Sequence, residues 1–309
     1  MIFLFKRSVF NMKNFRYWLV AKIAIFIIRV LKILPINFAL KVASSIIRFI
    51  GPKLKRHKLI LRNLQNAFPE KTRDEIHRIA IDSWEHMSRL AVECFFLDRL
   101  FDFDVKNLDD SRIEVSGLSI FLDLRDNPRP FIIFTGHTGN FELLSIVGAA
   151  YLLPISVLFR PPNNKYLAEE IFKFRSSYMS LLIPSQFGSY FELMRQLEKG
   201  FGIGLLVDQK INKGLTTTFF GQPVKTNPLL PKLVNQFNCD VYPARCIRLP
   251  NNRFRLEIEP KLDIYRDKNG NFDMTAIAQL LNDTVERWVR EYPEQWLWYH
   301  DRWNIKHMI

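Results

Sequence analysis

Residues 130–144 read PFIIFTGHTGNFELL, and the predicted fold is organised around this stretch. The run Phe131–Phe134 has the aromatic and β-branched residues of a buried strand. A small-residue turn, 135–139, follows it and leads into a helix that we expect to begin near Asn140. A buried strand, a glycine turn and a helix N-terminus together form the corner at which α/β proteins place their chemistry.

Two side chains of this stretch, His137 and Glu142, are candidates for acid–base chemistry. On one continuous helix they would lie about 140° apart and would not face each other. If His137 stays in the turn and Glu142 lies in the first helical turn, the carboxylate can hold one ring nitrogen and make the other a stronger base. The structural alternative is that His137 caps the helix and Glu142 complements its dipole. The spacing alone leaves both interpretations open.

The pattern on either side of this corner alternates between strands and helices. Alternation of this kind predicts an α/β fold with a mostly parallel central sheet and helices on both faces. The predicted strands are Ile113–Val115, Phe131–Phe134, Ile155–Phe159, Ile203–Val207, Thr216–Phe220, Val241–Ile247 and Phe254–Ile258, and the predicted helices are 72–97, 140–152, 165–182, 190–199 and 274–291.

The net charge of +13 comes from the N-terminal quarter of the chain. Residues 1–69 hold 14 Lys or Arg and no Asp or Glu, whereas the remainder is close to neutral. The basic residues are interleaved with Ile, Val and Leu. This combination favours an anionic membrane surface as the partner and argues against nucleic acid.

Residues 15–34 are strongly apolar but are interrupted by Lys22, Arg29 and Lys32. The charge-free runs are much shorter than the roughly 20 residues of a spanning helix. One basic stripe on an apolar helix is typical of a segment that lies in the membrane interface, with Trp18 at the headgroups. A single membrane span is the alternative.

A second apolar helix is predicted over 36–50, and no linker or internal repeat follows residue 70. We therefore divide the chain into membrane-attachment helices, 1–60, and an α/β domain, 61–309. The three cysteines form no CxxC pair and no metal pattern with histidine, which predicts buried, reduced thiols.

Several short motifs occur in order between about residues 55 and 303. They are Arg62-Asn63-Leu64, Ala67-Phe68-Pro69-Glu70, the HX4E motif His137-Thr138-Gly139-Asn140-Phe141-Glu142, Asp208-Gln209, Phe219-Phe220-Gly221, and the C-terminal PEQWLWYHDRW of 293–303. Taken together, these motifs resemble those of the late acyltransferases of lipid A biosynthesis, the lauroyl/myristoyl transferases of the wider glycerolipid acyltransferase superfamily. We interpret the tryptophans of the last motif as core residues.

The resemblance implies transfer of a fatty acyl group from an acyl-carrier-protein thioester to a hydroxyl of a phosphorylated glucosamine glycolipid, a lipid A precursor. It implies action at the cytoplasmic face of the inner membrane and no cofactor besides the acyl-carrier-protein co-substrate. The attachment to the anionic inner membrane through residues 1–60, and the absence of a nucleic-acid partner, are predicted from the basic and apolar composition of that segment. His137 and Glu142 match the catalytic pair of the family. Arg175 and Asp208 match functional positions that follow it.

The implied chemistry asks for these residue types. A neutral imidazole at His137 takes the hydroxyl proton, and Glu142 orients it and stabilises the imidazolium. Backbone N–H groups of Gly139 and Asn140 can stabilise the developing oxyanion. No covalent enzyme intermediate is needed, and the HX4E spacing does not indicate a metal site.

Three further residues are candidates for substrate binding. Arg175 and Arg160 can each hold a phosphate, although a helix-surface salt bridge is the structural alternative for Arg175. Asp208 follows a predicted buried strand, where parallel sheets present functional groups, but it could instead cap the next turn.

Other functions remain open at this stage. One is an acyltransferase for another glycolipid or a lysophospholipid, and another is a membrane-bound homologue without activity. The sequence does not determine the acyl chain length, the position acylated or the oligomeric state.

Overall fold

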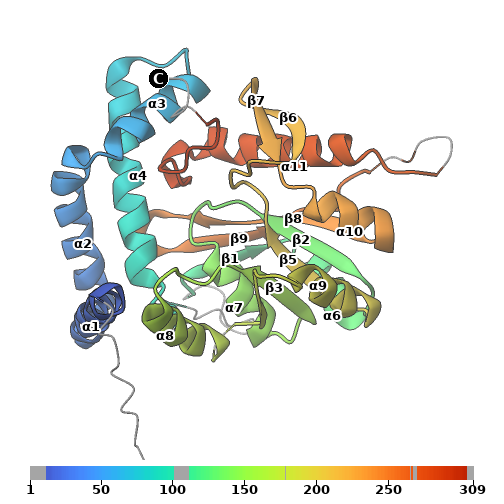
Figure 1. Cartoon of the computed structure of the whole chain (residues 1–309), viewed down its shortest axis with the longest axis horizontal. Helices are drawn as coiled ribbons and strands as arrows, with labels where there is room; N and C mark the ends of the chain where they lie inside the picture. The colour runs from blue at the N-terminus through green and yellow to red at the C-terminus, as the bar shows by residue number, and fades with distance from the viewer. Residues whose placement is uncertain (1–11, 101–110, 178, 265, 267–269, 305–309) are drawn as a thin grey trace, which may run out of the picture.

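The computed structural model describes residues 12–304 apart from 101–110, 178, 265 and 267–269 (Figure 1). Its centre is a mixed sheet with the strand order β1-β9-β8-β2-β5-β3-β4. All neighbouring strands run parallel except β8 and β9, which are antiparallel. The strands are β1 (Ile113–Ser116), β2 (Phe131–Thr135), β3 (Ile155–Phe159), β4 (Leu181–Pro184), β5 (Gly202–Leu206), β8 (Asp240–Arg248) and β9 (Phe254–Ile258).

The helices cover both faces of this sheet, as the sequence predicted, and further helices flank it (Figure 1). Along β2 the side chains alternate between the faces, as a strand requires. Ile132 and Phe134 belong to the core beneath α9, α10 and α11, whereas Phe131 and Ile133 pack toward α6 and α7. The helices are α3 (His57–Ala67), α4 (Arg73–Glu93), α5 (Leu97–Leu100), α6 (Leu118–Asp126), α7 (Glu142–Ala150), α8 (Lys165–Ser176), α9 (Ser189–Glu198), α10 (Leu229–Phe237) and α11 (Met274–Glu291).

A separate hairpin, β6 (Leu215–Phe219) and β7 (Gln222–Thr226), packs on α11. Its two turn residues, Phe220 and Gly221, both have positive φ, 52° and 68°. Two positive φ angles define the type I′ turn, whose twist matches that of a two-stranded ribbon. The first strand of this hairpin was predicted from the sequence and the second was missed, since a Phe-Gly pair is a weaker turn signal than Asn-Gly.

The predicted helix over 165–182 is wrong in its second half. Helix α8 ends at Ser176, and residues 181–184 form β4 instead. Among the described strands it lies at the edge of the sheet and pairs with β3. The pairing overrides a local sequence that is compatible with either state. The shorter helices α3, α6 and α10 were also missed.

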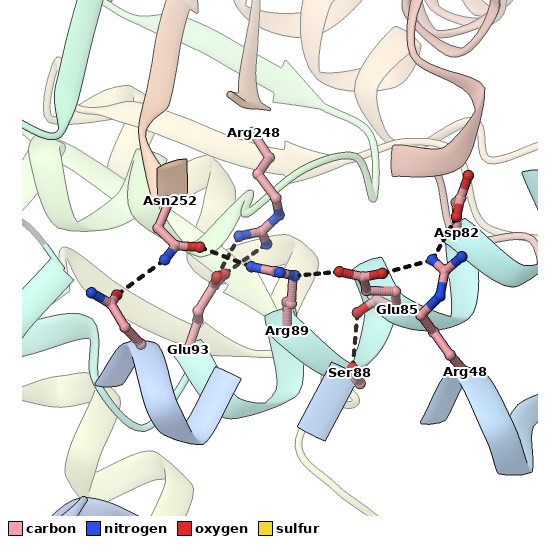
Figure 2. Close-up of polar contacts among 9 residues, drawn as sticks. Arg48, Asp82, Glu85, Ser88, Arg89, Glu93, Arg248 and Asn252 are labelled. Carbon is pink, nitrogen blue, oxygen red and sulfur yellow. Dashed lines mark hydrogen bonds and ion pairs between the residues drawn. The ribbon is translucent and has the colours of Figure 1, made fainter. Parts of the chain in front are cut away.

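Two N-terminal helices, α1 (Met12–Ile33) and α2 (Ile36–Ile50), lie along one side of the molecule (Figure 1). Helix α2 packs along α4 through Ala39, Leu40 and Ser44, and its other face leaves Phe38 and Phe49 exposed. Its outer end is tied to α4 by ion pairs from Arg48 to Asp82 and Glu85, at 2.6 and 2.7 Å (Figure 2). Helix α1 packs against α8. Within the part of the chain that the structure describes, no helix combines the length and apolar character needed to cross a bilayer.

Candidate active site

His137 and Asp208 come together because β2 and β5 are parallel neighbours. Thr135, the last residue of β2, pairs with Leu206, the last residue of β5. His137 and Asp208 each follow two residues later, so both lie at the carboxyl edge of the sheet. This is the edge at which open α/β sheets bind their ligands.

Asp208 holds His137 by two contacts. The distance from Oδ1 of Asp208 to Nδ1 of His137 is 2.7 Å, and Oδ2 accepts the backbone N–H of His137 at 2.8 Å. The indole N–H of Trp296 also donates to Oδ2, at 2.8 Å. Burial by itself would raise the pKa of Asp208, but the charge and hydrogen bonds of His137 and the bond from Trp296 outweigh it and hold the pKa well below its ordinary value.

An ionised Asp208 determines the tautomer of the imidazole. A carboxylate only accepts hydrogen bonds, so Nδ1 of His137 carries the proton and Nε2 carries the lone pair. The amide nitrogen of Gln209 lies 2.9 Å from Nε2 and donates to it. Nε2 is therefore a basic nitrogen, and the side chain that contacts it belongs to the residue directly after Asp208.

Glu142 does not orient His137 in the structure, and this part of the prediction is corrected. Glu142 is buried at the start of α7 and forms an ion pair with Arg175 of α8. The charge of His137 acts on Glu142, but the two ring nitrogens of His137 contact Asp208 and Gln209. Burial raises the pKa of Glu142, and the nearby positive charge of Arg175 opposes that rise.

The predicted oxyanion donors, Gly139 and Asn140, are already engaged within the protein. The N–H of Gly139 donates to the backbone oxygen of Gln295 at 3.0 Å. Asn140 is fully buried, and its backbone N–H donates to the sulfur of Cys246. Its side-chain amide donates to Glu93 at 2.9 Å. Gly139 has a φ of +56°, and a Cβ there would collide with the carbonyl oxygen of Cys246. These residues hold the turn in place, and neither lines the large cavity of the site.

A cavity of about 880 Å³ lies against the face of the sheet beneath α6 and α7. In its floor, Ile133, Gly204 and Val157 stand side by side on β2, β5 and β3. A Cβ on Gly204 would lie 3.0 Å from Val157, so the absent side chain deepens the cavity at this point. Most of the lining is apolar. The polar lining, at the carboxyl edge of the sheet, includes His137, Glu142, Arg160, Arg175 and Gln209.

Five of the predicted site residues thus lie at or beside the carboxyl edge of the sheet, four in the lining of the cavity and one behind it. His137, Glu142, Arg160 and Arg175 line the cavity, and Asp208 lies behind His137. Arg160 directly follows β3 and is exposed. Among the described residues there is no group of three or more His, Cys, Asp or Glu side chains that could hold a metal ion.

Sequence reasoning missed the roles of Gln209 and Trp296. The tail tryptophans are core residues as predicted, with Trp296, Trp298 and Trp303 at most 5% exposed. Trp296 additionally holds the Asp208 carboxylate in place, because its indole N–H donates to Oδ2. The signal that could have identified Asp208 as the partner of His137 is their equal distance from the ends of two buried strands. It becomes usable only when the strand order is known.

A buried carboxylate–histidine pair at the polar end of an apolar cavity is suited to proton transfer on a bound, largely apolar ligand. The comparisons with known proteins agree. The family model for bacterial lipid A biosynthesis acyltransferases matches residues 6–305, and the chain therefore belongs to this family. It is also similar to lipid A biosynthesis acyltransferase 2 of Shigella flexneri, with 23% identity over 270 residues, 85% of this chain and 83% of that protein.

Proposed function

We propose that this chain transfers a fatty acyl group from an acyl-carrier-protein thioester to a hydroxyl of a lipid A precursor, with His137 as the general base. Membership of the family supports acyl transfer in lipid A biosynthesis. The observation that carries the mechanism is the pair of His137 and Asp208 beside the cavity.

In this mechanism, Nε2 of His137 takes the proton of the acceptor hydroxyl as its oxygen attacks the thioester carbonyl carbon. Asp208 keeps the proton on Nδ1 and stabilises the imidazolium that forms. The tetrahedral intermediate then collapses, the carbon–sulfur bond breaks, and Nε2 returns the proton to the leaving thiolate. The products are the ester and the free thiol of the carrier, and no bond to the enzyme forms.

Gln209 is the proposed donor to the oxyanion. Its amide N–H donates a hydrogen bond to the lone pair of Nε2, and the acceptor hydroxyl must donate to the same lone pair. When the acceptor hydroxyl binds to Nε2, it replaces the amide of Gln209 as the hydrogen-bond donor. The freed amide N–H can then donate to the negative oxygen of the tetrahedral intermediate. Arg175, paired with Glu142, lies in the lining of the same cavity.

The cavity is the proposed acyl site. Its volume is within the range of pockets that enclose a small-molecule ligand, and its lining beneath α6 and α7 is apolar. The hollow extends from the carboxyl edge, near His137, along β2 to Ile133 and β3 to Ile155. An acyl chain that follows the strands would place its carbonyl carbon beside His137. Arg160, exposed at the same edge, is the proposed contact for a phosphate of the glycolipid.

Helices α1 and α2 are the proposed membrane contact, at the cytoplasmic face of the inner membrane. Their outer surface exposes Phe26, Ile33 and Phe49, at 66, 82 and 69%, in a segment without acidic residues. Such a surface suits the interface of an anionic bilayer. Flotation of the full chain with vesicles tests this. We expect stronger binding to anionic than to zwitterionic vesicles, and loss of binding for Phe26→Glu/Phe49→Glu. Equal flotation of both proteins would contradict the proposal.

The activity test uses purified full-length protein in detergent with a tetraacylated lipid A precursor. Lauroyl, myristoyl and longer acyl chains are supplied on acyl carrier protein and, separately, on coenzyme A. We expect the mass of one acyl chain to be added from the carrier-protein donor and the addition to be lost in His137→Ala. Transfer from coenzyme A alone would contradict the proposed donor. If no donor acylates lipid A, lysophospholipid and other glycolipid acceptors are tested next, and failure of all would indicate an inactive homologue.

A further inference from the structure

Beneath the turn that carries His137 lies a second polar cluster, formed by Glu93, Arg248 and Asn140. Glu93 is the last residue of α4 and is fully buried. Arg248, at the end of β8, gives both of its terminal nitrogens to the Glu93 carboxylate, one of them at 2.7 Å to Oε2. The side-chain amide of Asn140 donates to the same Oε2 at 2.9 Å. Figure 2 shows the ion pair of Glu93 and Arg248 beside the network that continues along α4.

Arg248 holds the turn by its backbone as well. Its N–H donates to the side-chain oxygen of Gln295 at 2.8 Å, and its carbonyl accepts the amide of Gln295 at 2.9 Å. The backbone oxygen of Gln295 in turn accepts the N–H of Gly139 at 3.0 Å. Side-chain and backbone contacts of one arginine therefore converge on two adjacent residues of the turn, Gly139 and Asn140.

The position of these contacts decides what they affect. Asn140 lies between His137, which contacts Asp208, and Glu142, which contacts Arg175. A rotation of the turn at Asn140 would move both of these side chains. A buried ion pair is also a poor source of net stability, because apolar residues of similar volume often do as well. The ion pair of Glu93 and Arg248 is therefore better explained as a device that holds the turn in one conformation than as a source of stability.

We propose that Glu93 and Arg248 are positioning residues, which act through Asn140 to fix His137 at the geometry needed for proton transfer. The proposal rests on the proposed role of His137 as the base. Neither residue lines the cavity, so they act on the turn and not on the substrate.

The chain supplies a matched control on the same strand. Arg245 is as buried as Arg248, with side-chain exposures of 7 and 8%, and it also pairs with glutamates, Glu257 and Glu291. It lies three residues away on β8 and points to the opposite face, where it contacts the ring of Trp288. Replacing either arginine by lysine keeps the charge and loses the two-pronged geometry.

The test compares Arg248→Lys, Arg245→Lys and Asn140→Ala in the full chain. For Arg248→Lys and Asn140→Ala we expect kcat to fall by about ten- to a hundredfold, the range that small misplacements of catalytic groups produce. The KM for the acyl donor should change by less than about twofold, because the cavity is intact. Arg245→Lys should keep kcat while losing thermal stability. In Arg248→Lys/Asn140→Ala the two losses should not add, since both act through one contact.

A second readout does not depend on activity. In protein labelled with ¹⁵N-histidine, the Nδ1–H signal of His137, identified by its absence in His137→Ala, should shift in Arg248→Lys and Asn140→Ala and stay in place in Arg245→Lys. If the wild type transfers no acyl group and this pattern is still seen, the proposed function fails and the positioning role stands. Equal effects of both lysine variants on kcat and on the signal, or an additive double variant, would overturn the positioning role.

Discussion

The two faces of the central sheet differ in how they are filled. On the face beneath α9, α10 and α11, Ile132 and Phe134 of β2 are fully buried, and the Phe134 ring stacks on Trp288 with centroids 6.0 Å apart. On the other face, Ile133 lines a cavity of about 880 Å³. One strand therefore contributes alternate residues to a packed core and to a hollow. The packed face holds the backbone rigid, which allows the opposite face to stay open for a ligand.

The largest expected effect on activity comes from a substitution at the carboxyl edge of the sheet, where Asp208 contacts His137. For Asp208→Asn we expect kcat to fall by about 10²–10⁴-fold, because the amide cannot stabilise the imidazolium and favours the wrong tautomer. Glu142→Gln should be less damaging, since Glu142 holds Arg175 and not His137. Steady-state rates with the carrier-protein donor measure both. The opposite ranking would restore Glu142 as the orienting group.

A pair of neighbouring substitutions tests the difference between the faces directly. Ile132→Ala should lower the free energy of unfolding by about 2–5 kcal/mol, because it leaves a void in a packed core. Ile133→Ala should lower it by about 1 kcal/mol or less, since it enlarges a cavity that already exists. Denaturant unfolding of each variant with a common slope gives the two values. Equal losses would mean that the second face is packed as tightly as the first.

Filling the hollow should change selectivity more than stability. Gly204→Val places side-chain carbons toward Val157 in the floor of the cavity. We expect kcat/KM for the longest accepted acyl chain to fall by about tenfold, with a shorter chain becoming the preferred donor. Competition between carrier proteins with different acyl chains measures this. An unchanged order of preference would place the acyl chain elsewhere.

The smallest expected effect is on the pH dependence of stability. The pKa of Asp208 is lower in the folded protein than in the unfolded chain, so its ionised form stabilises the fold. This contribution is present above the unfolded value of about 3.9 and is lost as the pH falls toward the folded value. Asp208→Asn should therefore lose less stability than the wild type between about pH 5 and pH 3. Urea unfolding at several pH values tests this, and parallel curves would contradict it.

Local patterns were sufficient for much of the fold. The strand at Ile155–Phe159 and the helix at 274–291 were predicted with the bounds that the structure has. The strand is a short apolar run rich in β-branched and aromatic residues, and the helix is long with apolar residues at helical spacing, so neighbours along the chain supply both signals. Edge strand β4 and the short helices were missed because their stability comes from contacts with distant segments.

Local sequence was enough to identify the corner at residues 130–144, the alternation that builds the sheet, the basic apolar N-terminus and the family. The contact of His137 with Asp208 instead of Glu142, and the place of Glu93 and Arg248 beneath the turn, follow from the folded chain. Spacing along the chain reports which residues share an element. The partners of a catalytic side chain are set by strand order, and the order β8-β2-β5 places residues from 71 positions away within hydrogen-bond distance of His137.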